Sequence, residues 1–425
     1  MEYIENKRLG EGYYKEILDN GLTVFVYPMM QKSSVYAMLS SPVGSSTLGF
    51  TVNGEEVNVP QGIAHFLEHK MFENEDGIDA FELFAKTGAS ANAYTSFDKT
   101  CYLFEASLNA KEALRTILGF VGSPYFTDET VAKEQGIIAQ EIKMYRDHPG
   151  WRQMFELLKL LYHEHPVRYD IAGSVESIAE ITKEKLHDFY NAFYNPKSMV
   201  LSVCGNISFE EVVKLCEEEF RIKEWKKYDS KVLRNTEPDS IAADYVKIEM
   251  PISSPQFSLG YKEVPFKKQD RVKNEVILDM LLDIIAGETS ELFRRLYDSN
   301  LINGDLSSET LSGDDYLCVI FSAESNDPDK AVDEIKKEID FFKKNGIPDS
   351  AFLECKRMNI GGTVGIFDDI SAVAAGMTYS HFKESGLFDE IEMLDSISKQ
   401  DVESMLMTTL QSDRAALSLL VPSEE

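Results

Sequence analysis

His65-Phe66-Leu67-Glu68-His69 is the most informative stretch of this 425-residue chain. Residues four positions apart in an α-helix lie one above the other, so the imidazoles of His65 and His69 can bind one metal ion. Glu68 lies near the same face of the helix and can hold a water molecule beside that metal. About 0.02 matches to H-x-x-[DE]-H are expected by chance in a chain of this composition. The alternative is a polar helix face that carries two solvated histidines.

A carboxylate from a second helix is expected to complete the site. Catalytic zinc usually takes three protein ligands and leaves a fourth position to water. The pattern of residues 127–146 predicts a helix, which Pro149 helps to end. Glu134 and Glu141 lie two turns apart on one face of this helix, so either can complete a His₂Glu site. The residues alone do not choose between them, and either glutamate can instead be solvated.

The H-x-x-E-H order is the inverse of H-E-x-x-H and is found in one group of zinc peptidases, the inverzincins. Together with four further segments, it resembles the pitrilysin and mitochondrial-processing-peptidase family, in its bacterial branch. The matching segments, in chain order, are 62–73, 88–96, 134–141, 195–206 and 288–293. The resemblance therefore spans most of the chain.

This resemblance implies both a fold and a site. The implied fold class is α+β, with two homologous α/β-sandwich domains of the metallohydrolase type, each an antiparallel-rich sheet with helices packed on it. The implied cofactor is Zn²⁺. Its ligands are His65, His69 and Glu141. The catalytic carboxylates are Glu68, as general base, and Glu134, behind the ligands. The substrate backbone is expected at Asn92 and Ala93.

The composition is that of a soluble enzyme. The hydrophobic content of 43% is ample for the cores of two domains, and no apolar run is long enough to predict a membrane span. The net charge of −29 argues against nucleic acid as a partner. The five cysteines lack C-x-x-C spacing, and the N-terminus lacks a signal core, so we expect a cytoplasmic protein.

Two halves with the same order of elements are expected. The first half predicts strands at 22–27, 35–39, 101–105 and 199–203, with helices at 110–121, 127–146, 151–164, 175–180 and 183–194. The second half predicts strands at 256–261 and 316–321, with helices at 274–286, 328–343 and 350–361. From Trp225 to Tyr245 the sequence becomes polar and charged, as in linkers. We therefore expect a zinc-binding domain at 1–228, a linker at 229–245 and a metal-free homologous domain at 246–425.

The second half departs from the family pattern in one respect. Peptidases of this family commonly carry an Arg and a Tyr there, which bind the substrate carbonyl and the developing oxyanion. Here the segment after Phe293 offers only Arg294, Arg295 and Tyr297, at shifted positions. These residues can act as substitutes, or a zinc-less homologous subunit can supply the pair. We favour the heterodimer, with a homodimer as the alternative.

The predicted function is that of a zinc metalloendopeptidase which hydrolyses unfolded peptides or leader and processing segments. A non-catalytic structural subunit of the same fold is the alternative, disfavoured because His65, Glu68, His69 and Glu141 are all present. A metal-binding module or a non-peptidase hydrolase is a third possibility, since a fold and a metal do not dictate a substrate.

Overall fold

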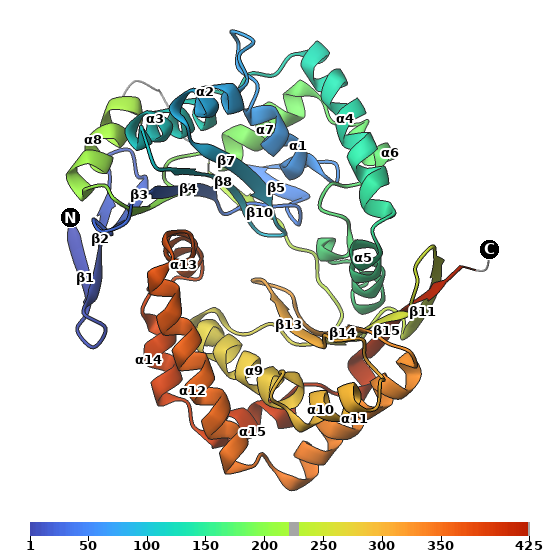
Figure 1. Ribbon diagram of the computed structural model, residues 1–425. Helices are drawn as coiled ribbons and strands as arrows, with labels where there is room; N and C mark the ends of the chain where they lie inside the picture. Colours follow the sequence, from blue (N-terminus) through green and yellow to red (C-terminus); the bar gives the residue numbers. More distant parts are fainter. Residues whose placement is uncertain (221–228, 424–425) are drawn as a thin grey trace. The chain divides into compact units, whose positions relative to one another are not determined.

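The computed structural model describes residues 1–220 and 229–423. The chain divides into two compact units, each built from separate stretches of sequence (Figure 1). The first unit comprises Met1–Ile142, Asp170–Arg234 and Gly365–Phe388. The second comprises Lys143–Tyr169, Asn235–Val364 and Asp389–Glu425.

A mixed sheet lies at the centre of the first unit. Its neighbouring strands are, in order, β1 (Glu2–Asn6), β2 (Glu11–Ile17), β3 (Thr23–Pro28), β9 (Val200–Gly205), β4 (Val35–Ser41), β8 (Thr100–Ala106) and β7 (Ser90–Thr95). β3 and β9 run parallel, whereas the other neighbours are antiparallel. The central strands are rich in apolar residues and almost wholly buried, as expected of strands covered on both faces. β7 forms one edge of this sheet.

Helices cover both faces of this sheet. Val24 and Val26 of β3 belong to one core, whereas Phe25 and Tyr27 belong to another, because alternate residues of a strand point to opposite faces. The helices of the first core are α1 (Ile63–Met71), α2 (Ala80–Thr87), α3 (Ala110–Val121), α4 (Asp128–Arg146), α6 (Val175–Ile178), α7 (Lys183–Phe193) and α8 (Phe209–Phe220). The second core is formed with α13 (Ile370–Phe382). A small sheet of β10 (Ser230–Val232), β5 (Gly49–Val52) and β6 (Glu55–Asn58) completes the unit.

The second unit has its own sheet and core. The strand order is β11 (Tyr245–Met250), β15 (Ala415–Pro422), β12 (Gln256–Lys262), β14 (Leu317–Glu324) and β13 (Ser307–Ser312). One face packs on α9 (Arg271–Ala286), α10 (Glu291–Asp298), α11 (Pro328–Asn345), α12 (Asp349–Gly365), α14 (Asp389–Ser396) and α15 (Lys399–Thr408). α5 (Pro149–Leu161) covers the opposite face, where Gly260 permits its close approach. A Cβ at Gly260 would lie 3.0 Å from Leu157 and Leu161.

The two units share one strand topology. In the first, β3-β9-β4-β8-β7 follows the chain order 1-5-2-4-3, and the parallel pair joins the first and last strands. In the second, β11-β15-β12-β14-β13 has the same order and the same parallel pair. The predicted class, two homologous α/β sandwiches with antiparallel-rich sheets, is therefore confirmed.

The division of the chain differs from the expected contiguous domains. The segment with α5 comes from the first half of the sequence but belongs to the second unit, and the segment with α13 does the reverse. The boundaries 1–228 and 246–425 miss this exchange, because an apolar helix face does not reveal which sheet it covers. The expected linker at 229–245 includes β10, which pairs with β5. The polar stretch that suggested this linker begins at Trp225, and its residues 225–228 lie outside the described residues.

In the described ranges, no single helix has both the length and the apolar character needed to cross a membrane. The segments Asp349–Asp368 and Ile370–Phe382 meet that test only when taken together, with a bend of 110° between them.

Candidate metal centre

The helix α1 presents two imidazoles on one face. Its apolar side chains Ile63, Phe66 and Leu67 are buried in the first core and fix the helix against the sheet. His65 and His69, one turn apart, have ring centroids separated by 4.6 Å. The i,i+4 spacing therefore places both rings on the same side of a helix whose apolar face is buried in the core.

Gly62 at the start of α1 is required by the backbone. It adopts a left-handed conformation with φ of 87°, which glycine tolerates without strain. A Cβ at this position would lie 2.4 Å from the carbonyl oxygen of Ala172. Both constraints favour glycine directly before the helix that carries the imidazoles.

The carboxylate of Glu141, on α4, lies near both imidazoles. Its Oε1 lies 3.8 Å from Nε2 of His65, and its Oε2 lies 3.5 Å from Nε2 of His69. One ligand atom from each residue lies within 4.8 Å of the others. Ligands at zinc bond lengths of about 2.0–2.1 Å in a tetrahedral site stand about 3.3 Å apart, so small side-chain movements suffice. Two imidazole nitrogens and one carboxylate also match the His₂Glu donor set of catalytic zinc.

Glu134 supports this group from behind. Its buried carboxylate accepts a hydrogen bond from Nδ1 of His69 at 2.9 Å, which turns Nε2 of the same ring toward Glu141. Such a carboxylate fixes both the tautomer and the orientation of a ligating histidine. The structure thus separates the two glutamates that the sequence left equivalent.

The two histidines have opposite pKa shifts. Burial, together with the nearby charge of His69, lowers the pKa of His65 to about 3, so this imidazole is neutral at pH 7 and can bind a metal. Burial also lowers the pKa of His69. The hydrogen bond to Glu134 and the charges of Glu68 and Glu141 outweigh that effect, so the net shift is upward. A proton therefore competes with a metal ion for His69, since a ligating imidazole nitrogen must be deprotonated.

Glu68 lies beside His65, His69 and Glu141 but is not one of the candidate metal ligands. Its carboxylate is buried, and its Oε2 accepts a hydrogen bond of 2.6 Å from Oγ1 of Thr95. Burial raises the pKa of Glu68 to about 7, although the Thr95 hydrogen bond and His69 act in the opposite direction. A carboxyl group with a pKa near neutrality is suited to accept and return a proton. Thr95 belongs to the matched segment 88–96, but no motif within that segment singles out its hydroxyl group.

The predicted substrate-binding residues lie on β7, the edge strand that ends at Thr95. Asn92 is exposed, and its side-chain oxygen accepts a hydrogen bond of 2.9 Å from the backbone N–H of Ala93. β7 pairs with β8 on one side only, as far as the described strands show. The same short strand therefore carries an available edge and the hydroxyl that holds Glu68.

Arg294, Arg295 and Tyr297 are the residues that could replace the family's Arg and Tyr. All three lie on α10, in the second unit. Arg294 pairs with Glu291 at 3.2 Å, and Arg295 pairs with Glu338 at 2.6 Å. Tyr297 is exposed, and its ring stacks near that of Phe293. Both guanidinium groups thus already have carboxylate partners within their own unit.

Two family models match most of the chain. Residues 38–174 match the family described as Insulinase (Peptidase family M16), and residues 180–359 match the description Peptidase M16 inactive domain. The chain is similar to the zinc protease YmfH of Bacillus subtilis (strain 168), with 35% identity over 99% of both chains.

Solved structures show the same fold. An M16-like peptidase from Alicyclobacillus acidocaldarius superposes with a TM-score of 0.95 and 32% identity, over 99% of this chain and 100% of that one. Pitrilysin, at 17% identity and a TM-score of 0.77, matches all of this chain with 47% of its own length. The near full-length similarity to YmfH and the two family matches lead to one assignment: the chain belongs to the insulinase family, peptidase family M16.

Proposed function

We propose that the chain is a zinc-dependent endopeptidase that cleaves unstructured peptides or leader segments, with Zn²⁺ held by His65, His69 and Glu141. The observation that carries this proposal is the convergence of these three donors within 4.8 Å, with Glu68 beside them. When bound, zinc supplies Lewis acidity and lowers the pKa of water. The relatives named as zinc proteases support the choice of metal.

Glu68 is the proton carrier in this proposal. Because Thr95 occupies Oε2, Oε1 is the atom left to accept the proton of the attacking water. The same carboxyl group then donates that proton to the leaving amine nitrogen. The pKa near 7 suits both steps, since the group must be a base first and an acid afterwards.

β7 is the proposed substrate strand. An extended peptide that pairs with the β7 edge gains backbone hydrogen bonds, which demand little of its sequence. Asn92 and Ala93 lie on this strand, three and two residues before Thr95. A folded substrate does not present a free extended segment, so we expect unstructured peptides to be preferred.

Reversible removal of zinc tests this function. Incubation with a chelator should abolish cleavage of an unstructured peptide, as followed by mass spectrometry of the products. Added Zn²⁺ should restore the cleavage at the same bonds, whereas Mg²⁺ should not, because it prefers oxygen ligands in octahedral geometry. Cleavage that persists after complete zinc removal would contradict the proposal.

We also propose that the chain works as one subunit of a pair, with a zinc-less homologue favoured over a second copy. Two observations support this: pitrilysin carries the fold of this chain in about half of its length, and both candidate arginines are already paired. Loss of one oxyanion donor typically costs about 10²–10³-fold in kcat. The purified chain should therefore be slow, and a co-expressed homologue should accelerate it at least a hundredfold. Full activity of the isolated chain as a monomer would contradict the pairing.

A further inference from the structure

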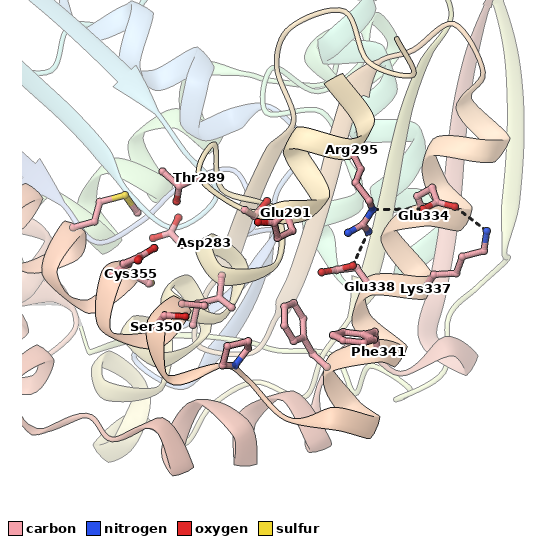
Figure 2. Close-up of a pocket in the computed structure, with 17 residues that line it drawn as sticks. Asp283, Thr289, Glu291, Arg295, Glu334, Lys337, Glu338, Phe341, Ser350 and Cys355 are labelled. Carbon is pink, nitrogen blue, oxygen red and sulfur yellow. Dashed lines mark hydrogen bonds and ion pairs between the residues drawn. The ribbon is translucent and has the colours of Figure 1, made fainter. Parts of the chain in front are cut away.

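A cavity of about 670 Å³ opens between helices of the second unit, within the size range of ligand pockets (Figure 2). α11 forms one wall and α12 the other, and the short turn at 346–348 joins the two helices. The end of α9 and the beginning of α10 supply the remaining lining. All of these elements belong to one compact unit, and none contributes to the metal centre.

The walls of this cavity expose large apolar side chains. Phe341 of α11 is 53% exposed and Met358 of α12 is 46% exposed. Ile284 and Phe342 are buried residues that complete the apolar part of the lining. Apolar side chains that gather in a hollow, rather than standing singly on a surface, mark a place where another molecule binds.

The positive charges of the lining are already neutralised. Figure 2 shows Arg295 between Glu334 and Glu338, and Lys337 beside Glu334. The nitrogen–oxygen distances are 2.6 Å from Arg295 to Glu338, 4.0 Å from Arg295 to Glu334 and 2.8 Å from Lys337 to Glu334. Two cations and two carboxylates thus compensate one another on the α10–α11 side.

The other acidic residues of the lining have no positively charged partner inside the cavity. Oδ2 of Asp283 accepts a hydrogen bond of 2.7 Å from the Asn359 amide, and no cation of the described chain lies at ion-pair distance from this carboxylate. Burial raises the pKa of Asp283, as expected of a carboxylate that lacks a counter-charge. Glu354 likewise has no ion pair within the described residues, and Glu291 contacts only the exposed Arg294. An apolar surface and an uncompensated negative charge therefore face the same space.

We propose that this cavity binds a peptide segment in which a large apolar residue lies next to Lys or Arg. The apolar side chain would contact Phe341 and Met358, while the cationic head would approach Asp283 and Glu354. The commitment to a basic segment rests on charge complementarity, both in the cavity and in the net charge of −29. This proposal is independent of the peptidase activity.

Fluorescence anisotropy on the full chain tests this binding. The probe is a labelled peptide with one Phe between Lys and Arg residues, in D-amino acids so that it resists cleavage, and the acidic counterpart replaces Lys and Arg by Glu. We expect the basic probe to bind and the acidic one not to bind. Higher salt should weaken the binding, because part of it is electrostatic.

Matched variants locate the binding. Glu354→Lys should weaken the binding of the basic probe at least tenfold. The control is Asp333→Lys, the same charge reversal on an exposed α11 residue outside the lining, which should not weaken it. Phe341→Ala should weaken the binding of the basic probe to a similar degree. Its control is Leu353→Ala, at an exposed apolar position of α12 outside the lining, which should leave the binding unchanged. All four positions are exposed, so the variants are expected to fold.

Three outcomes would overturn the proposal. Equal binding by all four variants would place the probe elsewhere, for example at the β7 edge. Equal binding of the acidic probe would remove the argument from charge. Binding of spermine as tight as that of the basic peptide would show that the cavity recognises charge alone and does not use its apolar wall.

Discussion

Replacement of Thr95 by valine should impair Glu68 without disturbing the metal ligands. Valine keeps the size and branching of threonine but cannot donate the hydrogen bond of 2.6 Å to Oε2 of Glu68. Hydrogen bonds to charged groups contribute about 1.5–3 kcal/mol. Because this bond stabilises the carboxylate and not the carboxylic acid, its loss should raise the pKa of Glu68 further.

The expected change in the pKa of Glu68 follows from these energies. One pKa unit corresponds to about 1.4 kcal/mol, so the pKa of Glu68 should rise by about one to two units above its value of about 7. At pH 7 the fraction of the base form would then fall about 5- to 50-fold. The acidic limb of the kcat/KM profile should move to higher pH by the same one to two units, since the general base must be deprotonated to act.

The assay is hydrolysis of a quenched peptide from pH 5 to pH 9, with zinc content measured on the same preparations. Thr95→Val should lower kcat at pH 7 with little change in KM, because the hydroxyl contacts Glu68 and is not part of the backbone edge. Thr95→Ser retains a donor and is the control, so its profile should stay close to that of the parent. An unchanged acidic limb in Thr95→Val, with normal kcat, would refute the role assigned to this hydrogen bond.

Three further predictions concern the ligands, their support and the fold. His65→Ala and His69→Ala should each lose zinc, measured by elemental analysis, and full retention in both would remove them as ligands. Glu134→Ala removes the acceptor that orients His69, so it should weaken zinc binding about 10- to 100-fold in a chelator competition, while unchanged affinity would leave the 2.9 Å hydrogen bond without a function. Leu157→Ala should destabilise the second unit by about 2–5 kcal/mol in urea unfolding, because its side chain is fully buried in α5; a loss under 1 kcal/mol would argue against that packing.

Much of the fold and of the site could be predicted from local pattern. A stripe of apolar residues predicted a helix at 127–146, which corresponds to α4. The strand expected at 101–105 corresponds to β8. The i,i+4 spacing placed His65 and His69 on one helix face because that geometry is local. Elements such as α13 and β15 were not predicted from the sequence, and α13 has little amphipathic pattern to reveal it.

Long-range properties could not be predicted in the same way. The choice between Glu134 and Glu141 depends on how α4 crosses α1, since both glutamates share one helix face. The hydrogen bond from Thr95 to Glu68 joins residues 27 positions apart, on a strand and a helix. The exchange of α5 and α13 depends on which sheet each helix covers, and neither helix carries that information in its own sequence.

The comparison of the parent chain with Glu68→Gln tests the central claim most directly. Both proteins should contain one zinc per chain, because Glu68 is not among the three ligands. Glutamine cannot accept the proton of the attacking water, so hydrolysis of a quenched unstructured peptide should fall by about 10²–10⁴-fold or more. Equal zinc content with this loss of rate is the predicted result. Equal zinc content with near-parental hydrolysis would contradict the proposed peptidase mechanism.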